Sequence, residues 1–292
     1  MFARILVALD GSSTAEAILP VVRRLARATG SEILLVKVVE SALEAEEDAA
    51  PQNETLFFAN RYLKVLALRL AHEGFQARPC LRIGSPGPAL TQAIREEGAT
   101  LLAMGTHGAT ASQDVACGHV TEYLLRTSPV PLLVTRYRVP RPEPPFRTLL
   151  IPLDGSRASL SVLPYAVDWS RGLGSRLVLV HVLPTPAGAP DPVRRWLEGL
   201  RETLSREGAP TDIAVKQGDP VDAILESLGT TSADALALTT HGLRCEVPEA
   251  PAGRVAERIL RRAGVPFLLV NPLLAAPAPL PGPPLEEFRA PA

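Results

Sequence analysis

An internal repeat constrains the fold of this chain more than any other feature of its sequence. RILVALDGSS at residues 4–13 returns as TLLIPLDGSR at residues 148–157, which is 144 positions later. RIGSPGPAL at 82–90 and KQGDPVDAI at 216–224 also match, but 134 positions apart. The first copy therefore carries ten more residues between these matches, and we place them around residues 41–54. A chain of 292 residues with this repeat predicts two domains of one fold.

Each copy alternates short apolar runs with longer amphipathic stretches, which is typical of βαβ units. In the first copy we expect strands at residues 4–9, 32–38, 76–83, 100–105 and 131–135. We expect helices at residues 14–29, 53–73, 87–97 and 119–127. The run LLVKVV is apolar at nearly every position, as in strands that are buried on both faces of a parallel sheet. The predicted fold class is therefore α/β, in two tandem domains.

The composition of the chain sets the domain boundaries and excludes several partners. We expect domains at residues 1–137 and 147–272, joined by a proline-rich linker at 138–146 and followed by a proline-rich, disordered tail at 273–292. The formal charge of -1 argues against binding to nucleic acid or to an anionic membrane. No apolar run reaches the roughly 18 residues of a membrane span, and the N-terminus does not read as a signal peptide. We therefore expect a cytoplasmic protein.

A glycine-rich stretch follows the fourth expected strand. MGTHGATASQDVACGHV, residues 104–120, contains Gly105, Gly108 and Gly118 and leads into the last expected helix. Asp10 ends the first expected strand, so it borders the same crevice at the carboxyl ends of the strands. Glycines let backbone N–H groups approach a ligand closely, and a helix N-terminus adds partial positive charge. The stretch therefore predicts an anion site suited to phosphates.

These motifs resemble the universal stress protein family, in particular its tandem two-domain members. The resemblance rests on VALDGS and IPLDGS, on MGTHG after the fourth strand, and on the loop pattern G-x-x-G-x9-G. It covers about residues 1–136 and 147–272. It implies that each domain is a five-stranded parallel sheet in the order 3-2-1-4-5. It also implies that the two domains pack as a pseudo-dimer within the chain, and it leaves open a further homodimer.

The resemblance also implies a ligand, because the ATP-binding class of this family holds adenosine phosphates in the glycine loop. The implied cofactor is ATP, with or without Mg²⁺, and the implied partners are an adenine nucleotide and a protein of unknown identity. Matched position by position, the family pattern places these residues around the nucleotide: Asp10 near ribose and metal, Val38 at adenine, Met104 and Gly105 at base and ribose, and Gly108, Gly118, His119 and Val120 at the phosphates.

The sequence departs from this pattern in both copies. His119 stands where the family has serine or threonine, so an imidazole replaces a hydroxyl donor. In the second copy Thr239 replaces the first glycine, Gly253 arrives one position late, and Arg254 follows it. We therefore expect one working nucleotide site in the first domain and a degenerate loop in the second.

Simpler interpretations stand beside these. Asp10 precedes a glycine and fits a tight turn without any ligand, and the loop glycines can also serve turns alone. His107, Cys117 and His119 offer three metal ligands, but no fourth is evident, so we expect no metal site. Cys117 next to a helix N-terminus suits either redox sensing or the filling of a tight loop.

The expected function is that of an ATP-binding universal stress protein with a regulatory role in stress resistance. Residues 105–118 contain no lysine or arginine, and the chain has no G-x-S-x-G elbow, so we expect no catalytic residues and at most slow ATP hydrolysis. A scaffold of the same fold that acts through protein contacts, without nucleotide, is the alternative. A nucleotidyl-transferring enzyme is less favoured, because neither a HIGH-type nor a PP-loop sequence occurs.

Overall fold

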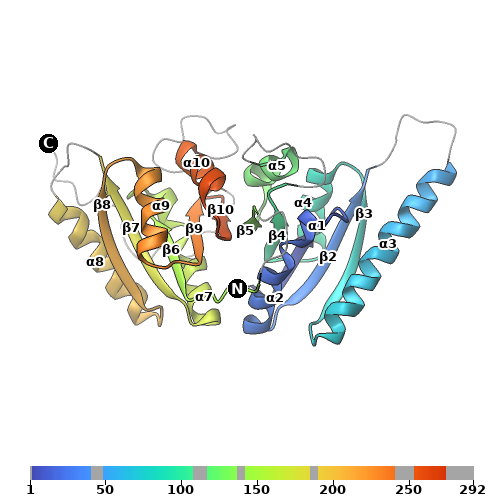
Figure 1. Cartoon of the computed structure of the whole chain (residues 1–292), viewed down its shortest axis with the longest axis horizontal. Helices are drawn as coiled ribbons and strands as arrows, with labels where there is room; N and C mark the ends of the chain where they lie inside the picture. The colour runs from blue at the N-terminus through green and yellow to red at the C-terminus, as the bar shows by residue number, and fades with distance from the viewer. Residues whose placement is uncertain are drawn as a thin grey trace. The chain divides into compact units, whose positions relative to one another are not determined.

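The computed structural model describes residues 2–40, 49–107, 117–136, 142–184, 190–240 and 253–273 (Figure 1). The chain divides into two compact units, the first spanning Phe2–Glu143 and the second beginning at Pro144. Both units are α/β, as predicted for two domains. Among the described residues, no helix combines the length and the apolar character needed to cross a membrane.

The first unit is built on a parallel sheet. Its strands are β1 (Arg4–Ala8), β2 (Glu32–Val39), β3 (Ala77–Ile83), β4 (Leu101–Gly105) and β5 (Leu132–Thr135). β2 pairs with β3 and β1, and β4 pairs with β1 and β5, so β1 and β4 lie inside the sheet. Every residue of β4 and β5 is buried. This is the pattern expected of strands that helices cover on both faces.

The helices of the first unit are α1 (Ser13–Glu16), α2 (Leu19–Thr29), α3 (Ala49–His72), α4 (Pro86–Glu96) and α5 (His119–Thr127). Right-handed crossovers, the rule for parallel sheets, put α1 to α3 on one face and α4 and α5 on the other. The contacts agree with this rule. The Tyr62 hydroxyl of α3 donates to Glu16 of α1, and Gly87 of α4 packs against the ring of Tyr123 on α5.

The single helix predicted at 14–29 is wrong, because the structure breaks it into α1 and α2. Pro20 is the second residue of α2 and has no N–H to continue a hydrogen-bond ladder from α1. Ala17 ends α1, its N–H bonding to the Ser13 carbonyl at 3.1 Å. Gly30 then ends α2 in the left-handed conformation at a φ of 69°.

The second unit repeats the first element by element. Its strands are β6 (Thr148–Pro152), β7 (Arg176–Leu183), β8 (Thr211–Gln217), β9 (Ala235–Thr239) and β10 (Phe267–Val270). Its helices are α6 (Arg157–Leu160), α7 (Leu163–Leu173), α8 (Pro190–Arg206), α9 (Pro220–Thr230) and α10 (Arg254–Arg262). β7 pairs with β8 and β6, and β9 pairs with β6 and β10, all in parallel. Pro164 separates α6 from α7 as Pro20 separates α1 from α2.

Phe146, the last residue of the predicted linker, belongs to the core of the second unit. Its side chain is 1% exposed, and its ring lies edge-on to Trp169 with the centroids 4.7 Å apart. Its carbonyl accepts a hydrogen bond from the Ser175 hydroxyl, just as the carbonyl of Phe2 accepts one from Ser31. The repeated contact shows that the apolar residue two positions before the first strand is part of each core.

Candidate functional site

Asp10 forms a tight turn directly after β1. Its Oδ1 accepts hydrogen bonds from the Ser12 N–H at 2.8 Å and from the Ser12 hydroxyl at 2.6 Å. The Ser12 hydroxyl in turn accepts from the Ala15 N–H at 3.1 Å and so caps α1. Gly11 between them has a φ of 92°, which favours glycine. The turn interpretation thus describes the local role of Asp10, and its exposed carboxylate remains accessible to a ligand.

Lys37 adds a cation that the sequence analysis missed. It lies on β2, and its Nζ donates a hydrogen bond to the carbonyl oxygen of Asp10. A Cβ on Gly11 would lie 3.3 Å from the same Nζ, so the ammonium sits against the turn. The signal in the sequence was a single lysine inside the apolar run of this strand.

The end of β4 packs closely against α1. Met104 is buried, and Gly105 is the last residue of the strand. A Cβ on Gly105 would lie 3.2 Å from the His107 carbonyl oxygen and 3.5 Å from the Thr14 carbonyl oxygen. The glycine therefore allows the backbones of β4 and α1 to approach at this edge.

The N-terminus of α5 is tied to the same edge. Gly118 is the N-cap residue of α5, and its N–H donates to the Thr106 carbonyl at 2.9 Å. His119 begins the helix with a fully exposed side chain, whose Nδ1 lies 4.0 Å from a carboxylate oxygen of Glu122. The first N–H groups of a helix have no acceptor within the helix and point toward whatever precedes it. Such donors suit an anion.

The strand register brings most of the predicted residues to one edge of the sheet. Ala8 pairs with Val36 and Val7 pairs with Ala103, so the residues that follow them lie at neighbouring carboxyl ends. Asp10, half-buried Val38, Met104 and Gly105 lie on or directly after these three strands. Gly118, His119 and half-buried Val120 begin the helix tied to this edge. Gly108 lies outside the described residues.

The suggested metal ligands do not gather in the described part of the chain. His107, Cys117 and His119 all belong to it, and no group of three or more histidine, cysteine or acidic side chains lies together there. The Nδ1 of His107 lies 2.8 Å from the Thr106 hydroxyl, and Cys117 is a buried free thiol. His107 thus contacts the hydroxyl of the residue before it.

The second unit reproduces the turn and the helix cap. The Oδ1 of Asp154 accepts from the Ser156 N–H at 3.0 Å and from the Ser156 hydroxyl at 2.6 Å. Gly253 is the N-cap residue of α10, and its N–H donates to the Thr240 carbonyl at 2.6 Å. Although Gly253 arrives one position late by counting, it therefore holds the structural place of Gly118. The extra residue lengthens the loop without moving the cap.

The two units differ in the side chains around the aspartate turn and the helix cap that they share. Thr239 ends β9, where the first unit has Gly105, and Arg254 begins α10, where the first unit has His119. On β7, His181 occupies the position that Lys37 has on β2. Its imidazole is buried, with Nδ1 2.8 Å from the Leu153 carbonyl and the ring edge-on to Trp196 at 6.0 Å. In this unit an imidazole packed in the core replaces the ammonium group.

The fold and this edge define an α/β protein with two copies of one domain. The sequence model of the universal stress protein family matches residues 1–136 and 145–271, and the chain belongs to this family. It is 30% identical over 137 residues to a universal stress protein of Thermus aquaticus, which covers 47% of this chain and 100% of that protein. It is 24% identical over 157 residues to one of Methanocaldococcus jannaschii, which covers 47% of this chain and 96% of that protein.

The fold of the whole chain is similar to the crystal structure of a universal stress protein from Archaeoglobus fulgidus. The two align with a TM-score of 0.75 and 22% sequence identity, over 93% of this chain and 99% of that one. At this identity the comparison supports the fold. It agrees with a tandem arrangement, because a single alignment extends over both units of the chain.

Proposed function

We propose that the first unit binds ATP at the carboxyl edge of β1, β2 and β4, and that the protein is a regulator in stress resistance with little or no hydrolysis. The observation that supports this most is the tie between Gly118 and Thr106, which fixes the start of α5 beside the end of β4. Helix N–H groups so fixed are suited to phosphate oxygens.

In the proposed complex each part of the edge takes one part of the nucleotide. The start of α5 takes the phosphates, with the His119 imidazole as an additional donor. Asp10 takes ribose hydroxyls or Mg²⁺, and Val38 and Met104 contact the base, as the family pattern implies. Lys37 lies close enough to the Asp10 turn to contribute positive charge.

Slow turnover follows from the chemistry of this edge. Fast phosphoryl transfer uses cations on the developing charge and a group that orients the nucleophile. Lys37 supplies a cation, but its Nζ already donates to a main-chain carbonyl. The proposed role is therefore binding, with nucleotide occupancy changing the loop that a partner recognises.

We propose that the second unit has lost this activity. Thr239 adds a β-branched side chain where Gly105 has none, and the long side chain of Arg254 occupies the first helical position. The helix cap itself is intact. Any loss therefore comes from side chains that occupy the ligand space, since the backbone donors are still in place.

Calorimetric titration with ATP and Mg²⁺ tests the proposal. The wild type should bind nucleotide, and Gly118→Arg should abolish binding by filling the anion site. A Cβ on Gly118 makes only an ordinary contact, 3.7 Å from the Thr106 carbonyl oxygen, and its φ of −75° suits any residue, so this variant should fold. Gly253→Arg is the matched control, because it makes the same change at the equivalent cap of the second unit.

Three variants should therefore separate the units. Asp10→Ala should weaken binding, Gly118→Arg should remove it, and Gly253→Arg should leave it unchanged. Wild-type protein that gives no binding heat at about millimolar ATP would overturn the proposal. So would binding that Gly253→Arg removes and Gly118→Arg leaves intact.

A scaffold without nucleotide is the second candidate, and the exposed imidazole of His119 at a family hydroxyl position favours it. Acid extraction of the purified protein separates the two candidates. Co-purified adenine nucleotide supports the binding proposal, and a nucleotide-free extract together with a silent titration supports the scaffold.

A further inference from the structure

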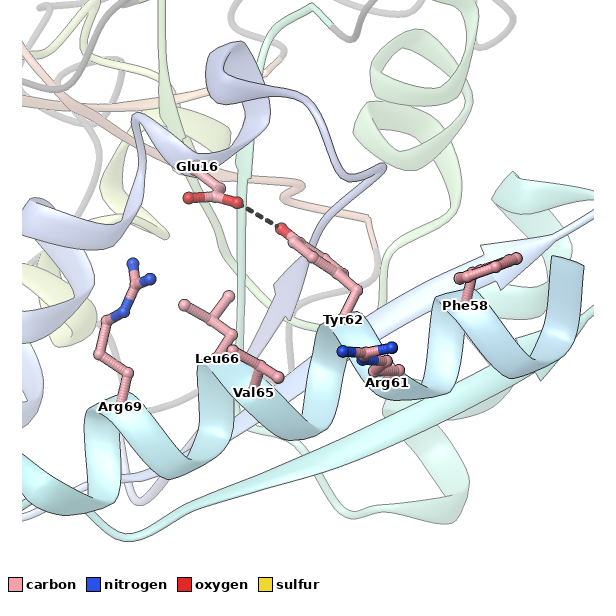
Figure 2. A pocket seen from close by; sticks show the side chains of 7 residues that line it. All are labelled: Glu16, Phe58, Arg61, Tyr62, Val65, Leu66 and Arg69. Atoms are coloured by element: carbon pink, nitrogen blue, oxygen red, sulfur yellow. Dashed lines mark hydrogen bonds between the residues drawn. The ribbon is translucent and has the colours of Figure 1, made fainter.

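Large apolar side chains are exposed along one helix of the first unit. On α3, Phe57 is 63% exposed, Phe58 is 61%, Val65 is 52% and Leu68 is 70%. Their spacing along the helix places them on the side that faces away from the sheet. Figure 2 shows Phe58 and Val65 on this helix beside a recess. Such a cluster on one element indicates a binding surface more than scattered apolar residues do.

The second unit shows that the fold does not need these side chains. α8 is the equivalent helix, and both helices end with the same bonds, from Gly74 N–H to the Ala71 carbonyl and from Gly208 N–H to the Ser205 carbonyl, each 3.0 Å. This aligns the helices at a spacing of 134 residues. Positions that pack on the sheet are buried and apolar in both helices, as the pairs Leu63 and Leu197, Leu66 and Leu200, and Leu70 and Leu204 show.

The outward positions of the two helices have diverged in character. Four outward positions are apolar or basic in α3 and acidic or small in α8, as the pairs Phe57 and Asp191, Lys64 and Glu198, Val65 and Gly199, and Leu68 and Glu202 show, whereas Arg61 and its equivalent Arg195 are both basic. The same backbone therefore tolerates a polar outer face. The apolar side chains of α3 serve something other than folding.

The exposed face of α3 is also basic on balance, with three basic side chains against the exposed Glu54. Arg61, Lys64 and Arg69 are exposed, and none of them forms an ion pair with a residue that the structure describes. Their charge lies between and beside the apolar side chains on the helix surface. An acidic partner would complement this arrangement, whereas a basic partner would be repelled.

A recess adjoins this face between α1 and α3. Its volume is about 320 Å³, and its apolar wall comes from Phe58, Val65 and Leu66. Arg61 and Arg69 line it as well, and Tyr62 closes one side by donating to Glu16 at 2.8 Å (Figure 2). A hollow of this size accommodates one large side chain of a docking segment.

We propose that this outer face of α3 with its recess binds an amphipathic acidic helix of another protein. Leucine-type side chains of that helix would cover the apolar residues and fill the recess, while its carboxylates would meet the guanidinium and ammonium groups of Arg61, Lys64 and Arg69. A second copy of this chain fits less well, because an α3–α3 contact would bring like charges together. An anionic bilayer also fits less well, since a flat lipid surface would leave the recess between α1 and α3 unfilled.

Fluorescence anisotropy with three labelled helical peptides tests the proposal. The peptides share one leucine stripe and differ only in the charged residues beside it, which are glutamate, glutamine or lysine. The protein should bind the glutamate peptide most tightly and the lysine peptide least tightly. Added salt should reduce the differences in affinity between the peptides. The titrations contain no nucleotide and are repeated on Gly118→Arg. If Gly118→Arg still binds the peptide, peptide binding to the α3 face does not depend on the proposed ATP site.

The matched variant is Lys64→Glu with Leu68→Glu, the residues that α8 carries at these positions. It should lower the affinity for the glutamate peptide at least about tenfold without changing the unfolding transition. Glu202→Gln on α8 is the control and should leave the affinity unchanged. The proposal is overturned if no peptide binds, if the lysine peptide binds as well as the glutamate peptide, or if the double variant binds normally. It is also overturned if phosphatidylserine vesicles, or a second copy of the chain, occupy the face and displace the peptide.

Discussion

Replacing Glu97 by glutamine should destabilise the first unit through its ion-pair network. Glu97 Oε2 lies 2.7 Å from Arg78 Nη2, and Oε1 lies 2.6 Å from Arg82 Nη2. Arg78 continues the network to Glu32 at 2.7 Å. Hydrogen bonds from Arg78 are the largest factor that lowers the pKa of both Glu97 and Glu32.

The expected cost of Glu97→Gln is about 2 kcal/mol in the free energy of unfolding. Each hydrogen bond to a charged group contributes about 1.5–3 kcal/mol when it is well covered. The Glu97 side chain is 18% exposed and Arg78 is 43% exposed, so solvent screening reduces this to about 1 kcal/mol for each bond. The amide of glutamine keeps the shape of the side chain, so little of this cost comes from packing.

The pH dependence gives this prediction a second, independent test. The pKa of Glu97 is lower in the folded protein than its unfolded value near 4.5. The stabilisation is therefore fully present above that unfolded value and is lost as the pH falls through the folded-state pKa. The gap in stability between wild type and Glu97→Gln should be constant near neutral pH and shrink progressively below pH 4.5.

The assay uses the distribution of tryptophan. The chain has 2 tryptophans, Trp169 and Trp196, and both lie in the second unit. Urea unfolding followed by far-ultraviolet circular dichroism reports both units, whereas tryptophan fluorescence reports the second alone. Glu97→Gln should shift the dichroism transition attributed to the first unit. The control Glu226→Gln breaks an exposed pair with Lys216 at 3.1 Å and should cost under about 0.5 kcal/mol. A Glu97→Gln cost no larger than the control, or a gap that widens in acid, would refute the reasoning.

Three further predictions concern packing and ionisation. Phe146→Ala should cost about 3–5 kcal/mol in unfolding free energy and shift the emission of Trp169 to the red, as denaturant titration followed by fluorescence will show. Gly87→Ala should cost about 1–3 kcal/mol in thermal or urea unfolding, because its Cβ would lie 2.5 Å from the Tyr123 ring. Burial, and then the hydrogen bond to Glu16, raises the pKa of Tyr62. Tyr62 should therefore not ionise near pH 10, and the absorbance change of tyrosine ionisation at that pH should be the same in Tyr62→Phe as in the wild type. A smaller absorbance change in the variant would contradict the burial argument.

The fold class could be predicted from the sequence because features that occur in both copies of the repeat indicate what the fold requires. Gly30 and Gly174 end equivalent helices at φ values of 69° and 70°, and they lie 144 residues apart, at the offset of the first repeated motif. The break between α1 and α2 was missed although Pro20 was visible. Proline is tolerated in the first turn of a helix, so its presence alone did not show whether one helix or two would form.

The candidate site was less predictable, because side-chain direction and loop length do not follow from residue spacing. Lys37 was missed because an apolar strand gives no indication of which carbonyl a single lysine reaches. Gly253 was interpreted as displaced, since counting cannot show that a longer loop still delivers the same cap to Thr240. Both corrections come from hydrogen bonds to main-chain carbonyls.

The duplication separates what the fold requires from what it merely tolerates. The aspartate turn and the glycine helix cap occur in both units with the same hydrogen bonds, so they do not explain a difference in binding between the units. The pairs Gly105 and Thr239, Lys37 and His181, and Leu68 and Glu202 occupy equivalent backbone positions with different chemistry. Because the fold accepts both members of each pair, the stability of the fold does not decide which of the two residues occurs. Function is therefore best sought at the differing positions, where exchanging one residue for its counterpart changes chemistry on a backbone already shown to accept it.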